Sequence, residues 1–411
     1  MPTSDKLDPP KVSIGLPVYN GEPHLRNAIE SLLSQDYANF ELIISDNAST
    51  DGTFDLCRTF AERDNRIRLY RNDTNIGAAA NFNRVFELAD GPYFSWAAHD
   101  DLVHSTYVSR CVGVLEENPD ILLCSADITF IDESGAVIDY PAQYCRLHTR
   151  GMDMRRRAKC LTSAVGWFSL YGIFRATALR KTRLITPDYG CDVLLLLELL
   201  FQGQTNVLPE RLFSFRYIPK ETRRYVTDIT GSAEHVPANP YTRLAQGLLR
   251  LIEDSGESVD LKVAMRNDLL DNVTRPSRRW RELILEENPA IARYPRHVQP
   301  VEMRRVLYKQ LSASELAHLR LRSHAMHILR LPAELCSSSW RAMRVTYDHF
   351  MAEAGRVHFW ADYGMDVGYM RRAVWYLHNL LRILGRQSFR SGHLAERGRS
   401  SVNSGGRNDD P

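Results

Sequence analysis

Two adjacent carboxylates, Asp100 and Asp101, follow a short apolar stretch at residues 93–98. The turn pair Gly91-Pro92 precedes that stretch, and this pattern is typical of a buried strand. In an open parallel sheet, ligands bind just beyond the carboxyl ends of the strands, which is where both acids would lie. The alternative is that one acid caps a following helix and the other belongs to a turn.

Two more polar segments follow apolar stretches in the same way. Pro17, Tyr19 and Asn20 end the first stretch, and Asp46 opens a polar tract at residues 46–53 after the second. An aromatic ring can pack on a nucleotide base, and a carboxylate can accept a hydrogen bond from a base or a ribose. A carboxylate can also hold a divalent cation that bridges phosphates. We therefore expect a nucleotide with bound Mn²⁺ or Mg²⁺, since the sequence contains neither the glycine-rich phosphate motifs nor their lysine.

Strands and helices are expected to alternate in the first part of the chain. The expected strands are residues 12–20, 40–45, 67–70, 93–98 and 121–131, and the expected helices are 24–34, 54–62, 78–88 and 105–117. This alternation predicts an α/β fold with a mostly parallel sheet and helices on both of its faces. Because proline has no N–H, we expect the first strand to end or bulge at Pro17.

The later sequence changes in character. Further expected elements are a hairpin return at 136–140, a helix at 152–161 with the solvated arginines 155–157, a strand at 167–175, a buried helix at 192–201 and a strand pair at 207–217. Only helical segments follow. We therefore predict a disordered tail at 1–10, an α/β domain at 11–235, an α-helical C-terminal domain at 236–385, and a polar disordered tail at 386–411.

The composition is that of an ordinary globular protein. Of the 411 residues, 44% are hydrophobic and 25% are charged, and the net charge of +2 gives no reason to expect nucleic-acid binding. The seven cysteines are scattered without Cys-x-x-Cys pairs, which favours reduced thiols in the cytoplasm. No apolar run approaches the roughly 20 residues that span a bilayer.

In order and spacing, these segments resemble a family 2 glycosyltransferase with the GT-A fold. The resemblance is carried by the run from Pro17 to Asn20, the tract 46–53, the turn Asn75-Ile76-Gly77 and the acid pair at 100–101. It covers about residues 11–220. It implies transfer of a sugar from a UDP-, GDP- or dTDP-sugar to a hydroxyl of a glycan or glycolipid, by one displacement that inverts the anomeric configuration.

The resemblance also implies roles for single residues of the donor site. Tyr19 would lie against the nucleotide base, and Asp46 would bond to the base or the ribose. Pro17, Asn20 and Asn75 would complete the donor site.

The metal motif departs from the family pattern. Asp100 would be the last acid of an Asp-x-Asp motif and Asp101 its neighbour, but Ala98 stands where the first acid is expected. His99 would point to the opposite side of an extended chain.

The general base of the family corresponds to Asp192, which here follows Cys191 in place of a glutamate. The alternative for Asp192 is a helix cap.

Two features stay open. Arg216, Lys220, Arg223 and Arg224 could close over a diphosphate as a lid or form a solvated loop. A helix at 369–386, apolar on one face and Arg-rich on the other, could lie on an anionic membrane or pack on the helical domain.

Two other functions compete with the transferase. One is a nucleotidyltransferase, which is disfavoured because its basic glycine-rich loop is missing. The other is a non-catalytic nucleotide-sugar-binding protein, suggested by Ala98 and Cys191. The donor sugar and the acceptor are not predicted, although the acceptor pocket is expected within 130–190, with the helical half as a second possible source.

Overall fold

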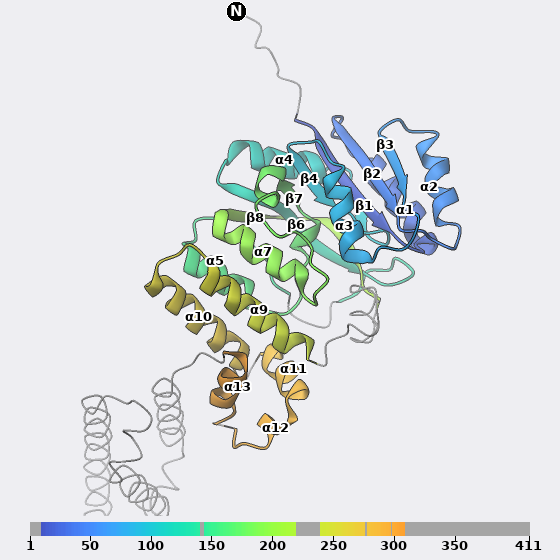
Figure 1. Cartoon of the computed structure of the whole chain (residues 1–411). Coiled ribbons are helices and arrows are strands. Elements are labelled where there is room, and N and C mark those ends of the chain that lie inside the picture. The colour runs from blue at the N-terminus through green and yellow to red at the C-terminus, as the bar shows by residue number, and fades with distance from the viewer. Residues whose placement is uncertain (1–9, 140–143, 219–238, 276–277, 297, 309–411) are drawn as a thin grey trace, which may run out of the picture. The chain divides into compact units, whose positions relative to one another are not determined.

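A computed structural model describes residues 10–139, 144–218, 239–275, 278–296 and 298–308. The described residues all belong to one compact unit, Met1–Lys309. Their central feature is a mixed sheet with helices on both faces, followed along the chain by a set of helices (Figure 1).

The sheet has the strand order β3-β2-β1-β4-β7-β6-β8-β5 in the described part of the chain. Its strands are β1 (Val12–Val18), β2 (Phe40–Asp46), β3 (Ile67–Arg71), β4 (Tyr93–Trp96), β5 (Leu102–Val103), β6 (Ile121–Ile131), β7 (Ile173–Arg175) and β8 (Gln204–Arg216). The contacts β1–β2, β1–β4, β2–β3 and β6–β8 are parallel. The contacts of β7 with β4 and β6, and of β5 with β8, are antiparallel. The predicted α/β fold is thus confirmed, with a mixed sheet.

Helices connect and cover the strands. They are α1 (Glu22–Leu33), α2 (Thr53–Ala61), α3 (Ala78–Glu87), α4 (Tyr107–Glu117), α5 (Met154–Leu161), α6 (Ala176–Leu179) and α7 (Cys191–Gln202). The helices after the sheet are α9 (Pro240–Asp254), α10 (Val259–Thr274), α11 (Arg279–Glu287), α12 (Pro289–Ala292) and α13 (Gln299–Leu307).

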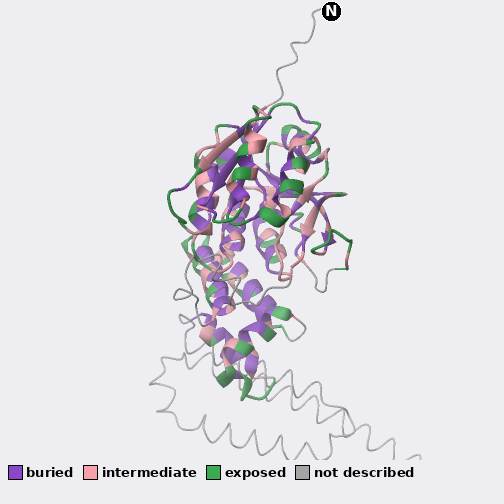
Figure 2. Ribbon diagram, turned by 90° about the vertical axis from the view of Figure 1, so that its right-hand side faces the viewer, coloured by how far each residue is buried: buried purple, intermediate pink, exposed green. Residues whose placement is uncertain are grey.

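Both faces of β1 are covered, so all seven of its residues are buried. Val12, Ile14, Leu16 and Val18 join one core cluster with residues of α1 and α4. Gly15 lies on the other face under α3, where an added Cβ would come within 2.6 Å of Val85. Figure 2 shows the resulting concentration of buried residues along the sheet and the helix sides that face it.

The first strand continues through Pro17, contrary to the expected break. Pro17 pairs in register with Ser45 of β2, while the ladder with β4 ends at Gly15 and Trp96. The carbonyl of Gly15 accepts from Ala97 on the β4 side, so alternation directs the Pro17 nitrogen to that same side. The missing N–H therefore falls beyond the end of the β4 ladder and costs no hydrogen bond.

Three later predictions need correction. The strand expected at 167–175 is shorter, because Ser169–Tyr171 form a 3₁₀ turn ahead of β7. The strand pair expected at 207–217 is one strand, β8, because a bulge absorbs residues 209–210 between the pairs Ala126–Leu208 and Asp127–Arg211. In the described residues, the hairpin return at 136–140 is a single bridge between Ile131 and Val137.

The arginines of α5 do not form a simple solvated face. Arg155 makes two hydrogen bonds to the buried Asp268 of α10, with Nε at 2.6 Å and Nη2 at 3.1 Å. The Trp167 ring packs edge-on against the fully buried Trp280 of α11, with 5.6 Å between centroids. The helices after the sheet are therefore docked on the α/β part. The predicted boundary at 235–236 stays a prediction.

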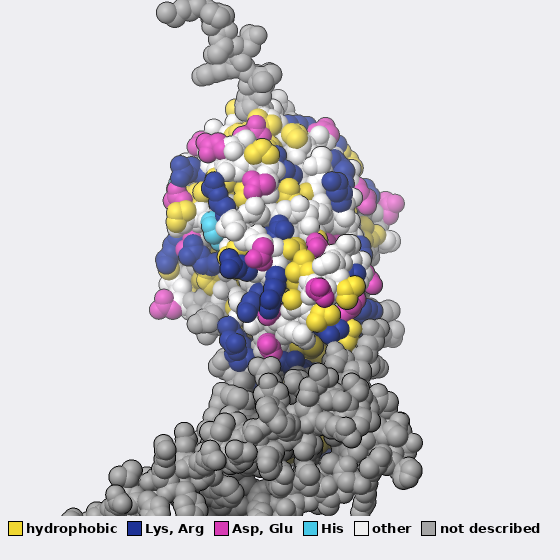
Figure 3. Space-filling view, turned by 90° about the vertical axis from the view of Figure 1, so that its left-hand side faces the viewer, with side chains coloured by type: hydrophobic (Ala, Val, Ile, Leu, Met, Phe, Trp, Pro, Cys, Tyr) yellow, Lys and Arg dark blue, Asp and Glu magenta, His cyan; other side chains and the backbone are white. Residues whose placement is uncertain are grey.

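The face drawn in Figure 3 carries Lys and Arg side chains among Asp and Glu side chains, so no single sign of charge covers it. None of the described helices is long and apolar enough to cross a membrane. The helix predicted at 369–386, the tails at 1–9 and 386–411, and Lys220, Arg223 and Arg224 lie outside the described residues.

Candidate functional site

The loops that follow β1 and β2 are joined by hydrogen bonds. Asn20, with a positive φ of 49°, donates its backbone N–H to Ser49 Oγ at 3.0 Å. Asn20 Oδ1 accepts from the backbone N–H of Thr50 at 2.9 Å, and Gly21 N–H donates to Thr53 Oγ1 at 2.8 Å. Beside this joint the Tyr19 side chain is 44% exposed, so a planar ligand can reach its ring.

Asp46 ends β2 and is fully buried. Its carboxylate accepts from the Ser49 N–H and pairs with Arg71, whose Nε lies 3.2 Å from Asp46 Oδ2. The Arg71 guanidinium lies over the Phe54 ring at 4.4 Å and donates to the Ser49 carbonyl at 3.1 Å. The carboxylate is thus held in one orientation by an arginine that the sequence analysis did not select.

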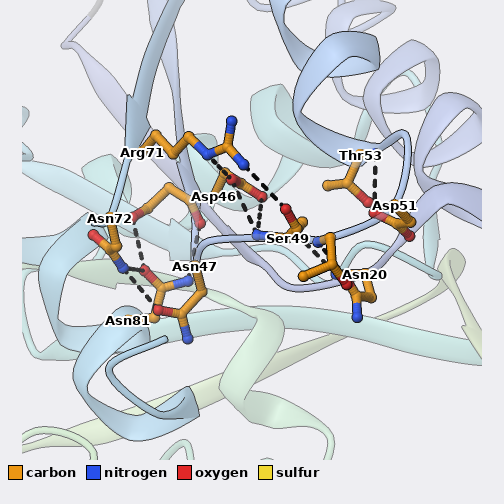
Figure 4. A network of polar contacts seen from close by, with 11 residues as sticks. Asn20, Asp46, Asn47, Ser49, Asp51, Thr53, Arg71, Asn72 and Asn81 are labelled. Atoms are coloured by element: carbon orange, nitrogen blue, oxygen red, sulfur yellow. Dashed lines mark hydrogen bonds and ion pairs between the residues drawn. The ribbon is translucent and has the colours of Figure 1, made fainter. Parts of the chain in front are cut away.

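A chain of asparagines extends from this loop (Figure 4). Asn47 Nδ2 donates to Asn75 Oδ1 at 2.8 Å, and Asn47 Oδ1 accepts from the N–H of Ile76 at 2.9 Å. Asn72 Nδ2 donates to Asn47 Oδ1 at 2.8 Å and to Asn81 Oδ1 at 3.2 Å. The turn that carries Asn75 is therefore fixed to the end of β2 and to α3.

Two of these asparagines were missed, although each had a signal in the sequence. Asn72 directly follows β3, so the strand-end argument used for Asp46 applies to it equally. Asn81 is a polar residue on the buried side of α3, only 2% exposed. It bonds to both the hydroxyl and the carbonyl of Ser45, at 2.7 and 2.9 Å.

The acid pair lies where the chain leaves β4 to form β5. Helix α4 begins at Tyr107 with Thr106 at its N-cap, so neither acid caps that helix. Asp100 is half-buried, whereas Asp101 is 4% exposed. Asp101 Oδ1 accepts from the backbone N–H of Arg216, the last residue of β8, at 2.8 Å.

Arg216 is a buried anchor of the acid pair. Its Nε donates to the Asp100 carbonyl at 2.8 Å, and its Nη1 donates to the carbonyls of Asp132 and Glu133 at 2.7 and 3.0 Å. Arg216 is only 5% exposed. It therefore belongs to the fixed frame of the site, which corrects the idea that it moves with a lid.

The acid pair offers part of a cation site. Asp101 Oδ2 is buried without a hydrogen-bond partner, and burial followed by the Asp100 charge raises the pKa of Asp101 well above its usual range. A cation beside the two carboxylates would give Asp101 Oδ2 a partner and would lower the pKa of Asp101. Carboxylate oxygens are suitable ligands for Mg²⁺ or Mn²⁺. No group of three or more His, Cys, Asp and Glu in the described ranges could hold a metal, so phosphate and water oxygens would have to complete the coordination.

Asp101 faces inward, whereas His99 is partly exposed. Asp101 lines a cavity of about 20 Å³ with Ser95 and Tyr107, enough room for one water molecule. The His99 ring packs on Gly21, where an added Cβ would lie 2.8 Å from His99 Cδ2. Asp100 is therefore the better placed of the two acids for a ligand.

Asp192 lies on a separate element, in the first turn of α7. Gly190, with a φ of 74°, occupies the N-cap position, so Asp192 is not the cap that the sequence allowed. Burial raises the pKa of Asp192 to about 6. A carboxylate with this pKa is deprotonated at pH 7 yet accepts a proton more readily than an ordinary aspartate. Burial also raises the pKa of the Cys191 thiol, which keeps it neutral.

The structure thus joins Asn20, Asp46 and Asn75 in one network below the exposed Tyr19. Pro17 is buried inside β1, in register with Ser45 of β2. The acid pair is held at the end of β4, and Asp192 is presented by α7.

Comparisons with known proteins agree with this arrangement. Residues 13–177 match the family model Glycosyl transferase family 2. EpsE of Bacillus subtilis (strain 168), by name a candidate glycosyltransferase, is 38% identical over 127 residues, which are 31% of this chain and 46% of EpsE. An uncharacterized glycosyltransferase of Haemophilus influenzae is 32% identical over 129 residues, which are 31% of this chain and 51% of that protein. The matched part therefore spans about half the length of these relatives.

Solved structures share the fold. Staphylococcus aureus TarS has a TM-score of 0.52 at 14% identity, covering 77% of this chain and 53% of the TarS chain. TarS 1–349 in complex with UDP has a TM-score of 0.52 at 14% identity, covering 78% of this chain and 92% of that one. At this identity the likeness establishes the GT-A fold alone.

Proposed function

We propose that this chain, whose residues 13–177 match the family model Glycosyl transferase family 2, moves a sugar from a nucleotide-diphosphate sugar to a hydroxyl of a glycan, glycolipid or related acceptor. The acceptor oxygen forms a bond to the anomeric carbon as the bond to the nucleotide diphosphate breaks. Asp192 takes the hydroxyl proton. A single displacement of this kind inverts the anomeric configuration.

One observation carries the proposal, namely the network of loops at the carboxyl ends of β1, β2 and β3. It holds Asp46, Asn47 and Asn75 in place through hydrogen bonds, and the exposed Tyr19 directly precedes Asn20, which belongs to the network. This edge of an α/β sheet is where nucleotides bind. A stacking ring with a fixed acceptor is the combination that a nucleotide base requires.

UDP-sugars are the first donors to test. Asp46 supplies an acceptor for a base N–H, and the TarS structures of the same fold contain UDP or UDP-GlcNAc. Asp100 and Asp101 would hold a divalent cation, Mn²⁺ or Mg²⁺, which when bound stabilises the negative charge of the departing diphosphate.

A second function is favoured by Ala98, which replaces the first acid of the metal motif. A protein with weakened metal binding could bind a nucleotide sugar without transferring it. Activity of the wild-type protein and its loss in Asp192→Asn, with donor affinity unchanged, would exclude this alternative.

The deciding experiment is a thermal-shift screen with UDP-N-acetylglucosamine, UDP-glucose, GDP-mannose and dTDP-glucose, each with and without Mn²⁺. We expect one nucleotide class to raise Tm, and to raise it further with Mn²⁺. If none of the four changes Tm under either condition, the nucleotide-sugar proposal is wrong.

A pair of substitutions at opposite ends of β2 tests the donor site. Asp46→Asn is expected to weaken binding of the best nucleotide sugar by roughly tenfold or more, since a charged hydrogen bond contributes about 1.5–3 kcal/mol. The control is Glu41→Gln, because Glu41 is also a buried β2 carboxylate, bound to Ser13, Arg68 and Lys11. Isothermal titration should show weaker binding for Asp46→Asn alone; equal losses in both variants would remove the assigned role of Asp46.

A further inference from the structure

The segment that leads into α7 is a bent connection with two left-handed residues. Leu184 has a φ of 57° and Gly190 a φ of 74°. Leu184 is not a glycine, and this conformation persists only where surrounding contacts hold it. The segment between them determines where α7 begins, and therefore where Asp192 lies.

Asn83 of α3 makes hydrogen bonds to this segment from one side. Its Nδ2 donates to the Ile185 carbonyl at 2.9 Å, and its Oδ1 accepts from the Ile185 N–H at 3.0 Å. One amide side chain thus satisfies both backbone groups of a single residue, 102 positions later in the chain. Ile185 itself is buried, so both groups would otherwise be left without partners.

Helix α9 holds the same segment from the other side. Gly190 packs directly on Leu244, since an added Cβ would lie 2.5 Å from Leu244 Cδ2. The Tyr189 ring meets the Tyr241 ring edge-on, with 5.0 Å between centroids. Further along α7 and α9, the two helices are again in close contact, because a Cβ at Gly247 would lie 3.1 Å from Leu194.

Two positions of α3 therefore serve different parts of the site. Asn81 bonds to Ser45 and Asn72 in the network below the donor loops. Asn83, two residues on, bonds backbone groups of the connection ahead of α7. A short rigid helix thus fixes the distance between the nucleotide loops and the start of α7.

We propose that Asn83 and α9 are positioning elements for Asp192, so that the helices after the sheet are required for sugar transfer but not for donor binding. The inference rests on the proposed function, because it takes Asp192 as the base. Asn83 touches no reacting group; it acts by holding the backbone ahead of α7. Displacing a reacting group by about 1 Å costs roughly 100-fold in rate.

The test compares Asn83→Ala with Asn81→Ala on the same helix. For the nucleotide sugar that shifts Tm most, turnover is measured as release of free nucleotide, and donor affinity by isothermal titration. Asn83→Ala is expected to lower kcat by roughly 10- to 100-fold with the donor Kd within twofold of wild type. Asn81→Ala is expected to raise the donor Kd instead. Equal effects of the two variants on Kd, or an unchanged kcat in Asn83→Ala, would overturn the proposal.

A second variant distinguishes loss of positioning from simple unfolding of the Asn83 variant. Leu244→Val loosens the α9 side without touching Asn83, and it should also lower kcat while leaving the donor Kd unchanged. Failure of the proposed function gives a different result: Asp192→Asn would then keep full turnover, or wild-type protein would bind none of the four nucleotide sugars. If Leu244→Val keeps full turnover while Asp192→Asn is inactive, the positioning role of α9 is contradicted and that of Asn83 is not.

Discussion

Asp192 is a partly buried carboxylate, and this has opposite consequences for activity and stability. Burial destabilises the carboxylate and raises its pKa to about 6, above the usual value for an aspartate. The deprotonated side chain is therefore a stronger base and also a source of instability at neutral pH.

The activity of the wild-type protein should follow this titration. Because only the deprotonated carboxylate can take the acceptor proton, kcat/KM should rise with pH up to about 6 and then level off. Asp192→Asn should lower kcat by roughly 100- to 10,000-fold. The matched control is Asp188→Asn, an exposed aspartate of the same loop, which should keep wild-type rates. A flat profile between pH 4.5 and 7.5 (about 1.5 units either side of the pKa) would contradict the assignment.

Stability should respond in the opposite direction. The folded protein binds the Asp192 proton more tightly than the unfolded chain, so this group stabilises the fold at low pH and loses that contribution as pH rises through about 6. Asparagine carries no charge at any of these pH values. Asp192→Asn should therefore raise Tm at pH 8 and leave it nearly unchanged at pH 4. A lower Tm at pH 8 would show that the carboxylate is stabilised by contacts.

At the scale of elements, the close approach of α3 to the sheet explains how the donor loops keep their shape. Helix α3 carries Asn81, and its buried Val85 lies directly over Gly15 of β1. Only a glycine leaves room there, because an added Cβ would lie 2.6 Å from Val85 and 2.8 Å from Phe94. The glycine in β1 is thus explained by packing.

Gly15→Ala should overpack this contact and lower the free energy of unfolding by about 1–3 kcal/mol. Adding Val85→Ala should recover part of that loss. The control is Gly113→Ala in α4, where an added Cβ meets nothing within 4 Å and helix propensity should raise stability by about 0.5–1 kcal/mol. Urea unfolding measures all three variants. Equal stability of Gly15→Ala and wild type would mean that α3 can move away from β1.

At the scale of the whole described unit, the helices after the sheet are attached by specific polar contacts as well as by packing. Asp268 of α10 is held by Arg155 of α5, and Asn272 of the same helix donates to Thr162 Oγ1 at 2.9 Å. These contacts join parts of the chain more than 100 residues apart. The α/β part and the docked helices should therefore unfold together.

Asp268→Asn should lower the free energy of unfolding by about 1–3 kcal/mol while keeping a single transition, because it leaves Arg155 with a weaker partner. Asp55→Asn serves as the control, since Asp55 forms an exposed ion pair with Arg58 whose loss should change stability by less than about 1 kcal/mol. Thermal unfolding followed by circular dichroism and by tryptophan fluorescence measures both variants. Two separate transitions in the wild-type protein would show that the docked helices fold independently.

Local pattern was enough to predict most of the fold. Strands β1 to β4 and helices α1 to α4 follow from apolar stretches and amphipathic periods of a few residues, and their bounds agree closely with the predicted ranges. The α/β fold and the placement of Asp46 and of the acid pair near strand ends followed as well, because Asp46 is the last residue of β2 and the acid pair comes shortly after β4. The roles assigned to these residues stay predictions.

Tertiary structure alone decided which residues support the site. Arg71 reaches Asp46 only because β3 lies beside β2, and Arg216 reaches Asp101 only because β8 turns back to the acid pair, 115 residues away in sequence. The strand pair predicted at 207–217 failed for the same reason, since Pro209 could be accommodated only by a bulge against β6. Sequence periodicity reports which face of an element is buried. It does not report which element covers that face, and the partners of Asp46, Asp101 and Asp192 depend on that.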